Sequence, residues 1–249
     1  MKPFLSALAV TLLGACVSAP TVAHPLDVAV IDRQTGQRLP VYYHHGKRYV
    51  VGTPGHKYAI ELRNQSGGRL LAVTSVDGVN VVTGETAHVG QSGYVLDARS
   101  STEINGWRKS LDEVAAFYFT SLPDSYAART DRPENVGVIG VAVFREYVPP
   151  RARITEPAAA AKSAETESGA ADRSRAPREE KLGTGHGDRE TSHVEYTDFK
   201  RATDKPAQLV TICYDSYRNL VARGVIPAKH AHELQPNPFP GNFVPDPKG

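Results

Sequence analysis

The sequence predicts an all-β fold, an antiparallel β-sandwich of about eight strands. Short segments between residues 26 and 148 alternate apolar and polar side chains, which is the period of a half-buried strand. Glycine, asparagine, aspartate and proline separate these segments at short intervals, as turns between strands require. Two later segments are apolar without interruption, which is typical of strands covered on both faces. Barrels share this pattern, and the spacing of the strands alone does not separate the two architectures.

The first half of the body is a series of short expected strands joined by turns. The expected strands are residues 26–32, 41–43, 48–51, 58–62, 70–76, 79–82 and 93–96. The strongest turn is Asp77-Gly78, which lies between two apolar β-branched runs. Both positions of a two-residue hairpin turn require positive φ angles, which aspartate and glycine tolerate. His45-Gly46 predicts a second tight hairpin.

The two uninterrupted apolar segments, residues 114–119 and 136–144, are expected at the centre of the body. Their length favours strands over helices, and so does their content of Val, Ile, Phe and glycine. These two strands complete a β-sandwich domain over residues 24–148.

The composition changes after Pro149, and residues 149–190 are predicted to be a low-complexity linker. Ala, Glu, Ser, Arg and Pro dominate this stretch, and it lacks aromatic residues. Such a segment buries too little apolar surface to offset its ordering entropy, about 1–2 kcal/mol per residue. We therefore expect a disordered connection between the sandwich and a second ordered unit.

Residues 191–249 are predicted to form a small strand–helix unit with a proline-rich tail. Two strands are expected at residues 194–199 and 209–214, followed by a helix with Asp215 as its N-cap and Gly224 at its end. Two strands and one helix are too few for an independent core, so the unit is expected to dock on the sandwich. The tail is expected to lie along the body.

Residues 1–23 have the pattern of a secretory signal peptide, with Lys2 ahead of an apolar run over residues 4–15. This run is too short to span a bilayer as a helix, which takes about 20 residues. Leu13-Gly14-Ala15-Cys16 resembles the lipobox of bacterial lipoproteins, which implies lipidation of Cys16 and an anchor of several acyl chains. Val17 is not aspartate, so the resemblance implies an outer-membrane lipoprotein facing the periplasm or the surface. The alternative is an ordinary cleaved signal that ends at Ala23.

Charge and cysteine content exclude some classes of protein. The chain has 29 basic and 27 acidic residues, and this balance gives no case for nucleic-acid binding. With Cys16 acylated, Cys213 has no partner for a disulfide within the chain. Cys213 lies in an apolar strand-like run and is expected to be a buried, inert thiol. A reactive thiol beside the following helix is the alternative.

We expect no catalytic residue, no cofactor and no metal site. His44 and His45 are adjacent in a strand and therefore point to opposite faces. His230, His232 and Glu233 have residue types that suit zinc, but the spacing supplies no further ligand. The glycine-rich residues 183–187 lack the strand, helix and lysine of a phosphate-binding loop. No Gly-x-Ser-x-Gly motif is present.

The strongest candidate for a ligand surface is Trp107 with Arg108, which follow Gly106. A tryptophan and an arginine side by side can stack on a sugar or a peptide. The alternative is that Trp107 packs over one end of the sandwich while Arg108 pairs with an acidic side chain.

Several segments together resemble a family of uncharacterised exported proteobacterial proteins. They are residues 75–78, 93–96, 104–108, 114–117 and 135–140, with residues 183–187 and 243–247 near the C-terminus. The resemblance implies export but no activity, so it assigns no functional residue.

These observations predict a non-enzymatic lipoprotein of the cell envelope, which supports the envelope or binds a protein or glycan there. One alternative is a hydrolase with its site between the sandwich and the C-terminal unit, using His186, His193, His230 or His232. Another is a component of a surface appendage, which would leave an apolar edge strand open.

Overall fold

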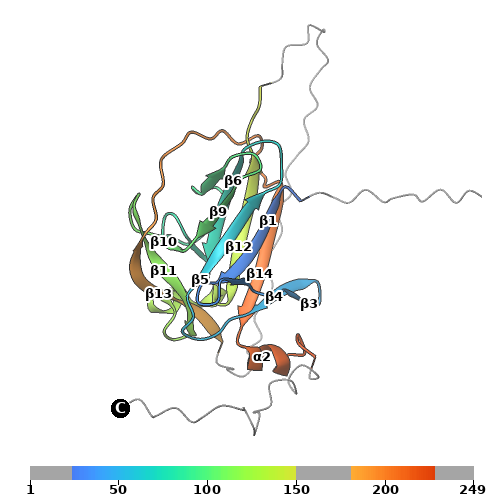
Figure 1. Ribbon diagram of the computed structural model, residues 1–249, viewed down its shortest axis with the longest axis vertical. Coiled ribbons are helices and arrows are strands. Elements are labelled where there is room, and N and C mark those ends of the chain that lie inside the picture. Colours follow the sequence, from blue (N-terminus) through green and yellow to red (C-terminus); the bar gives the residue numbers. More distant parts are fainter. Residues whose placement is uncertain (1–23, 150–180, 228–249) are drawn as a thin grey trace, which may run out of the picture.

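The computed structural model describes residues 24–149 and 181–227. It confirms the all-β sandwich fold, built from antiparallel sheets with only short helices (Figure 1). The strands are β1 (Leu26–Asp32), β2 (Gln37–Arg38), β3 (Tyr42–His44), β4 (Lys47–Val51), β5 (Tyr58–Asn64), β6 (Leu70–Val76), β7 (Val79–Asn80), β8 (Tyr94–Leu96), β9 (Ser101–Ile104), β10 (Gly106–Arg108), β11 (Glu113–Ser121), β12 (Val138–Arg145), β13 (Leu182–Thr191) and β14 (Gln208–Asp215). The helices are α1 (Tyr126–Arg129), the 3-10 turn η1 (Pro133–Asn135) and α2 (Tyr217–Ala222). The expected signal peptide, its lipobox, most of the linker and the proline-rich tail lie outside the described residues.

Three sheets enclose one main core. The seven-stranded sheet has the order β3-β4-β14-β12-β6-β7, with β8 also paired to β6. A four-stranded sheet, β2-β1-β5-β9, and a three-stranded sheet, β10-β11-β13, face it. The chain passes from β9 to β10 through a single residue, Asn105, and Lys57 bridges to Tyr118 between the two smaller sheets. The two smaller sheets therefore act as one curved layer opposite the large sheet.

Aromatic side chains fill the middle of the core. The Tyr58 ring stacks on Phe119 at 4.3 Å and on Phe117 at 5.3 Å between ring centroids. All three side chains are buried. Tyr58 comes from the four-stranded sheet and the two phenylalanines come from β11, so the stack joins the two smaller sheets.

Strand β13 corrects the predicted linker, because residues 182–190 were expected to be disordered. They form a ten-residue strand paired to β11. This strand consists mainly of glycine and polar residues, so its sequence lacks the apolar alternation that predicts a strand. Gly185 lies against the Tyr118 ring so closely that a Cβ would come within 2.2 Å of it, so a larger residue there would force the Tyr118 side chain to move.

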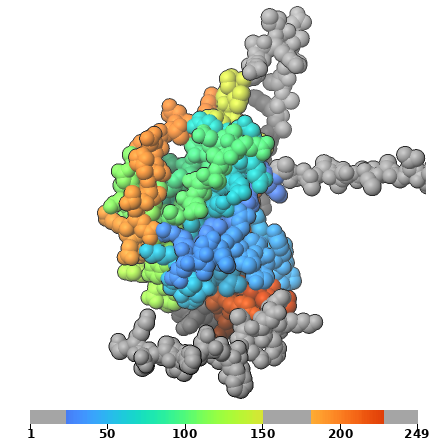
Figure 2. All heavy atoms as spheres, viewed as in Figure 1, coloured from blue at the N-terminus to red at the C-terminus, as the bar shows by residue number. Residues whose placement is uncertain are grey.

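The C-terminal unit supplies an interior strand rather than an extra edge. Strand β14 lies between β12, to which it is antiparallel, and β4, to which it is parallel. Figure 2 shows segment 181–227, in orange to red, forming one continuous surface with the earlier strands. The C-terminal unit, which was expected to dock on the sandwich, therefore contributes a strand to the large sheet across the described residues.

Two local expectations near this unit are wrong. Residues 194–199 are not a strand, and Phe199 instead packs against the outer face of the seven-stranded sheet beside Phe144 and Leu71. The N-cap of α2 is Ser216, whose hydroxyl accepts from Asn219 N. Asp215 instead accepts from the backbone of Ser216 and the side chain of Asn219, so it supports the cap from one residue earlier.

Gly106 makes the close crossing at which β10 meets β11, and we predict that alanine is not tolerated there. A Cβ at this position would lie 2.0 Å from the carbonyl oxygen of Ala115, a backbone atom that cannot swing away. Gly106→Ala is expected to lower the free energy of unfolding by about 3 kcal/mol, measured by urea denaturation. The control is Gly67→Ala, because a Cβ at residue 67 would meet no atom within 4 Å; it should stay within about 0.5 kcal/mol of the parent. Equal stability of the two variants would contradict the crossing.

Candidate functional site

A groove of about 390 Å³ opens at the edge of the sandwich, between β1 and the β3–β4 hairpin. It is lined by His24, Leu26, Asp27, Val28, Tyr43, Arg48, Gln65, Gln208 and Leu209. Its walls come from both layers and from the C-terminal unit. The groove therefore exists only once β14 has inserted beside β4.

On the side that faces the groove, Val28 of β1 has no neighbouring strand to pair with among the described residues. Leu26 pairs with Asn64 across the sheet, and Asn64 N donates away from β1 to Ser100 O at 2.8 Å. In an antiparallel ladder, Leu26, Val28 and Val30 then direct their N–H and C=O groups away from β5. Leu26 uses both groups on the Gln208 side-chain amide, at 3.0 and 2.9 Å.

Val28 and Val30 are the next residues of β1 that direct their backbone groups away from β5, and they differ in whether these groups are paired. The Val30 carbonyl accepts from Leu39 N at 2.8 Å. Val28 lies between Leu26, whose N–H and C=O are both paired, and Val30, whose carbonyl is paired. It lines the groove and has no strand partner on that side within residues 24–149 and 181–227. The outward N–H and C=O groups of Val28 face the groove, so a ligand amide could pair with them there.

The opposite wall combines an aromatic ring with a cation. Tyr43 and Arg48 are cross-strand neighbours in the hairpin, and Tyr43 is 75% exposed. Leu209, at the start of β14, is 64% exposed. Within the described residues, no acidic side chain lies within salt-bridge distance of Arg48. The groove therefore presents an open backbone position, an exposed aromatic and apolar surface, the cation Arg48 without a described salt-bridge partner, and the acid Asp27, which lies 3.1 Å from Arg38.

A second polar feature lies inside the core, around Asp77. Its Oδ1 accepts from the Tyr214 hydroxyl at 2.5 Å and from Gly137 N at 2.9 Å, and its Oδ2 accepts from Thr184 N at 2.8 Å. The Thr184 hydroxyl lies 2.6 Å from the Tyr214 hydroxyl and 2.7 Å from that of Tyr58. With the carboxylate ionised, the protons run in one direction, from Tyr58 through Thr184 and Tyr214 to Asp77.

The pKa of Asp77 is raised to about 6, because burial penalises the charged carboxylate more than the hydrogen bonds favour it. Burial also raises the pKa of Tyr58 and Tyr214 well above the usual value, so both remain protonated donors. Asp77, Thr184 and Tyr58 are inaccessible to solvent. This cluster therefore connects β5, the β6–β7 turn, β13 and β14, and offers no substrate a point of entry.

Two histidine–aspartate pairs lie on the surface. His56 Nδ1 is 2.7 Å from Asp32 Oδ2, and His193 Nδ1 is 2.7 Å from Asp112 Oδ1. Asp32 Oδ1 also accepts from the backbone of Gln34 and Thr35, which holds the carboxylate in a tight turn at the end of β1. No hydroxyl or thiol nucleophile hydrogen-bonds either histidine within the described residues. Both pairs therefore fasten loops, and neither forms a nucleophilic triad.

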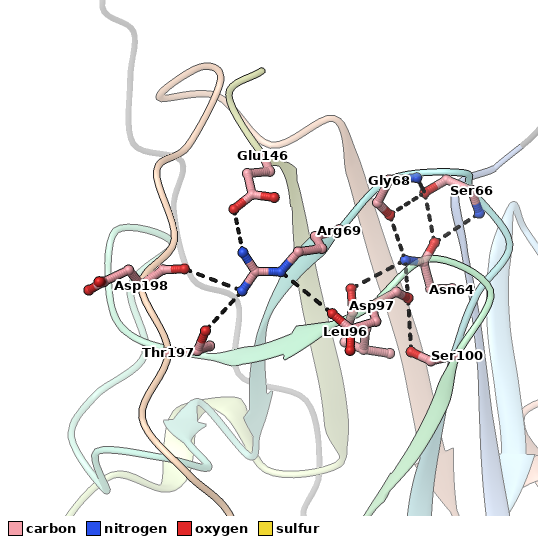
Figure 3. Close-up of polar contacts among 10 residues, drawn as sticks. All are labelled: Asn64, Ser66, Gly68, Arg69, Leu96, Asp97, Ser100, Glu146, Thr197 and Asp198. Atoms are coloured by element: carbon pink, nitrogen blue, oxygen red, sulfur yellow. Dashed lines mark hydrogen bonds and ion pairs between the residues drawn. The ribbon is translucent and has the colours of Figure 1, made fainter. Parts of the chain in front are cut away.

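Arg69 links the start of β6 to the end of β12 and to residues 197 and 198 (Figure 3). Its guanidinium donates to Glu146 at 2.6 Å, to the Thr197 hydroxyl at 3.0 Å and to the Asp198 carbonyl at 3.3 Å. Arg69 immediately precedes β6, and Glu146 immediately follows β12. Thr197 and Asp198 belong to residues 194–199, which were expected to form a strand. Arg69 thus connects residues 197 and 198 to the edge of the large sheet at which β6 begins and β12 ends.

Asn64 organises the neighbouring turn in the same view (Figure 3). Its side-chain nitrogen donates to the carbonyls of Gly68 and Asp97 at 2.8 and 2.7 Å, and its oxygen accepts from Ser66. Asn64 is buried and bonds both to its own turn and to Asp97, 33 positions away, so these hydrogen bonds are structural.

The structure contradicts Trp107 as a ligand-stacking surface. Trp107 is 2% exposed and packs edge-on against Phe117 at 4.8 Å between centroids. Arg108 donates to the Tyr94 hydroxyl at 2.9 Å and to the Ser192 hydroxyl and carbonyl. The alternative of a packing tryptophan is correct, although Arg108 pairs with neutral oxygens rather than with an acid.

The other predicted candidates do not converge. His186 packs beside the rings of Trp107 and Tyr126, and burial together with nearby cations lowers its pKa. Residues 183–187 belong to β13 rather than to a loop. Cys213 is a free, half-buried thiol packed in the cluster under α2. His230, His232, Glu233 and Cys16 lie outside the described residues, and no group of three metal-ligating side chains gathers within those that are described.

Comparisons with known proteins give no assignment. The chain matches no protein-family model and shows no significant similarity to curated proteins or solved structures. Among the described helices, none is long and apolar enough to cross a membrane.

The groove could not be found by inspecting the sequence, although one signal was present. Residues 33–60 contain no acidic side chain, and five Lys and Arg residues fall within them. Arg33, Arg38 and Lys57 find acidic partners elsewhere in the fold, whereas Arg48 meets none among the described residues. This acid-free stretch includes the β3–β4 hairpin, which forms one wall of the groove.

Proposed function

We propose that this protein is a non-enzymatic lipoprotein of the cell envelope, anchored through acylated Cys16, which binds a protein or glycan partner through the groove. The observation that carries the proposal is the position of His24. It lines the groove and lies eight positions after Cys16.

Chain length limits how far the groove can be from the membrane. Eight residues extend to at most about 26–29 Å when fully stretched. An acyl anchor on Cys16 would therefore hold the groove within about 30 Å of the lipid surface. Several acyl chains give stable anchoring where one is marginal, so the groove would stay within this distance of the membrane.

The chemistry of the groove suits binding better than catalysis. Val28 offers a backbone donor and acceptor, Tyr43 offers a ring, and Arg48 offers a charge. A peptide supplies complementary groups for all three, and so does a glycan with amide substituents and an acid. The hydrolase and the surface appendage component stay predictions.

We expect Cys16→Ser to abolish acylation and to release the protein from the membrane. The two cysteines of the chain provide a matched pair, because Cys213→Ser makes the same substitution in the folded body. The measurement is incorporation of an alkyne-labelled fatty acid in a bacterial host that processes lipoproteins, followed by membrane fractionation.

The expected result is loss of label and a soluble protein for Cys16→Ser, with label and membrane retention unchanged for Cys213→Ser. The intact mass of the parent should correspond to a chain that begins at Cys16 and carries acyl groups. Equal labelling and retention of the two variants would refute the anchor. So would a mature N-terminus at residue 24.

A further inference from the structure

The backbone of Val28 discriminates between the two classes of partner that the groove chemistry allows. We infer that the groove binds an extended peptide that carries a carboxylate, and that one residue of this peptide pairs with Val28 at the edge of β1. The inference rests on the proposed role of the groove as a binding site, and it narrows the partner from a protein or glycan to a peptide segment.

The two outward groups of Val28 require a partner that offers a donor and an acceptor on the same side. In an extended strand, the N–H and C=O groups of one residue point in the same direction, and the opposing residue of an antiparallel pair satisfies both. The acetamido group of a sugar is a trans secondary amide, so its N–H and C=O point to opposite sides. Only one of them can reach Val28, whereas a residue of an extended peptide supplies both.

The neighbouring positions on β1 show which groups complete this edge. At Leu26, the Gln208 side chain donates with its nitrogen and accepts with its oxygen, at 2.9 and 3.0 Å, so its amide takes the place of an opposing residue. On the other side of Val28, the Val30 carbonyl accepts from Leu39 N at 2.8 Å. The partners along this edge therefore leave a gap at Val28 that corresponds to one paired residue, and the gap opens into the groove.

The hairpin wall supplies the contacts that select an acidic peptide. Arg48 lies two residues before Val50 in β4, and the Val50 side chain is part of the main core, so Arg48 leaves the strand from the face directed at β1. Tyr43 is its cross-strand neighbour and offers an exposed ring beside it. Asp27 also lines the groove, but it lies 3.1 Å from Arg38, which compensates its charge. A carboxylate beside the paired residue is therefore the complement of Arg48, as side chains confer selectivity when a peptide adds to a sheet edge.

Nuclear magnetic resonance of the full chain tests the inference on Cys16→Ser, which keeps every described residue and does not depend on acylation. The first probe is a mixture of tetrapeptides, acetyl-Ala-Xaa-Asp-Ala-amide, in which Xaa is Gly, Ala, Val, Leu or Phe. The second probe is the disaccharide N-acetylglucosaminyl-N-acetylmuramic acid, which has acetamido groups and a carboxylate but no peptide. The chemical shifts of the Val28 amide proton and the Val28 carbonyl carbon report hydrogen bonding at each group separately.

The peptides are expected to shift both Val28 resonances. Arg48→Gln should weaken their binding about fivefold, through loss of one exposed ion pair. Lys47→Gln is the matched control, because it removes the same charge from the adjacent residue, whose side chain leaves the opposite face of β4. Its binding should stay within about twofold of that of Cys16→Ser alone.

A peptide that shifts only one of the two Val28 resonances, or equal binding by Arg48→Gln and Lys47→Gln, would overturn the pairing with an acidic peptide. Binding of the disaccharide in place of the peptides would overturn the inference and leave the proposed function standing, because the partner would then be a glycan. If neither probe shifts Val28 at millimolar concentration, the inference and the proposed role of the groove both fail. Acylation of Cys16 is measured separately, so failure of the anchor is distinguishable from each of these results.

Discussion

Replacing Asp77 with alanine is expected to lower the free energy of unfolding by about 3–5 kcal/mol, because each buried donor left unpaired costs about 1–3 kcal/mol and the losses are not additive. Three donors lose their acceptor, namely the Tyr214 hydroxyl and the backbone N–H groups of Thr184 and Gly137. Urea denaturation measures the change. Asp204→Ala, on an exposed loop, is the control and should stay within about 0.5 kcal/mol of the parent.

The same carboxyl should give the stability of the parent protein an unusual pH dependence. Its folded pKa is about 6, above the ordinary value of 3.8, so the folded state holds the proton more tightly than the unfolded chain does. The sign follows from linkage: this contribution is fully present below pH 4, declines as the pH rises to about 6, and is lost above it. The size of the decline is on the order of 3 kcal/mol.

Asp77→Asn isolates this term because asparagine keeps the shape of the side chain but cannot ionise. Other carboxyls act in the opposite direction at low pH, since hydrogen bonds and ion pairs lower the pKa of Asp32, Glu61 and Glu190 despite an opposing burial contribution. The informative quantity is therefore the difference between the parent and Asp77→Asn at each pH. That difference should shrink between pH 4 and pH 6. A difference that is constant over this range would contradict a buried, proton-binding Asp77.

Replacing Trp107 with alanine is expected to cost about 3–5 kcal/mol of folding free energy, the usual range for deleting a buried aromatic side chain. The ring contacts Phe117 edge-on and lies 4.9 Å from Tyr126 between centroids, so its removal leaves a cavity where α1 meets the three-stranded sheet. Thermal or urea unfolding measures the effect.

Two further variants separate packing from ligand binding at this position. The Trp107 ring nitrogen has no hydrogen-bond partner within the described residues, so Trp107→Phe loses volume alone and should recover most of the stability lost in Trp107→Ala. Tyr43→Ala removes an exposed ring in the groove and should leave stability within about 0.5 kcal/mol. An alanine variant of Trp107 with unchanged stability would restore the ligand-surface interpretation.

Much of the strand pattern was readable from the chain because it depends on neighbouring residues. Asp77-Gly78 forms the predicted hairpin turn, and both residues have positive φ angles. The apolar run at residues 136–144 corresponds closely to β12, an interior strand of the large sheet. Periodicity and turn chemistry are local properties, so they survive without knowledge of the fold.

Local pattern failed where a distant partner decides the environment. Strand β13 has glycines and charges instead of apolar alternation, and its conformation follows from pairing with β11 across the 149–180 segment. The sequence around Trp107 and Arg108 is compatible with an exposed pair of side chains and equally with a packed pair. Their burial depends on Phe117, Tyr126 and Ser192, which no local rule brings near them.

Residue order was therefore enough to predict the strand-rich class and the strongest turns, and it carries the expected export and acylation signal at Cys16. It was not enough to show that Asp77 meets Thr184, 107 positions away, that β14 enters the middle of a sheet, or that β1 and the β3–β4 hairpin enclose a groove. These features appear only in the folded chain, because the burial, charge state and pairing of a side chain are set by what packs around it. In a sandwich with non-consecutive strand order, those neighbours are remote in the chain.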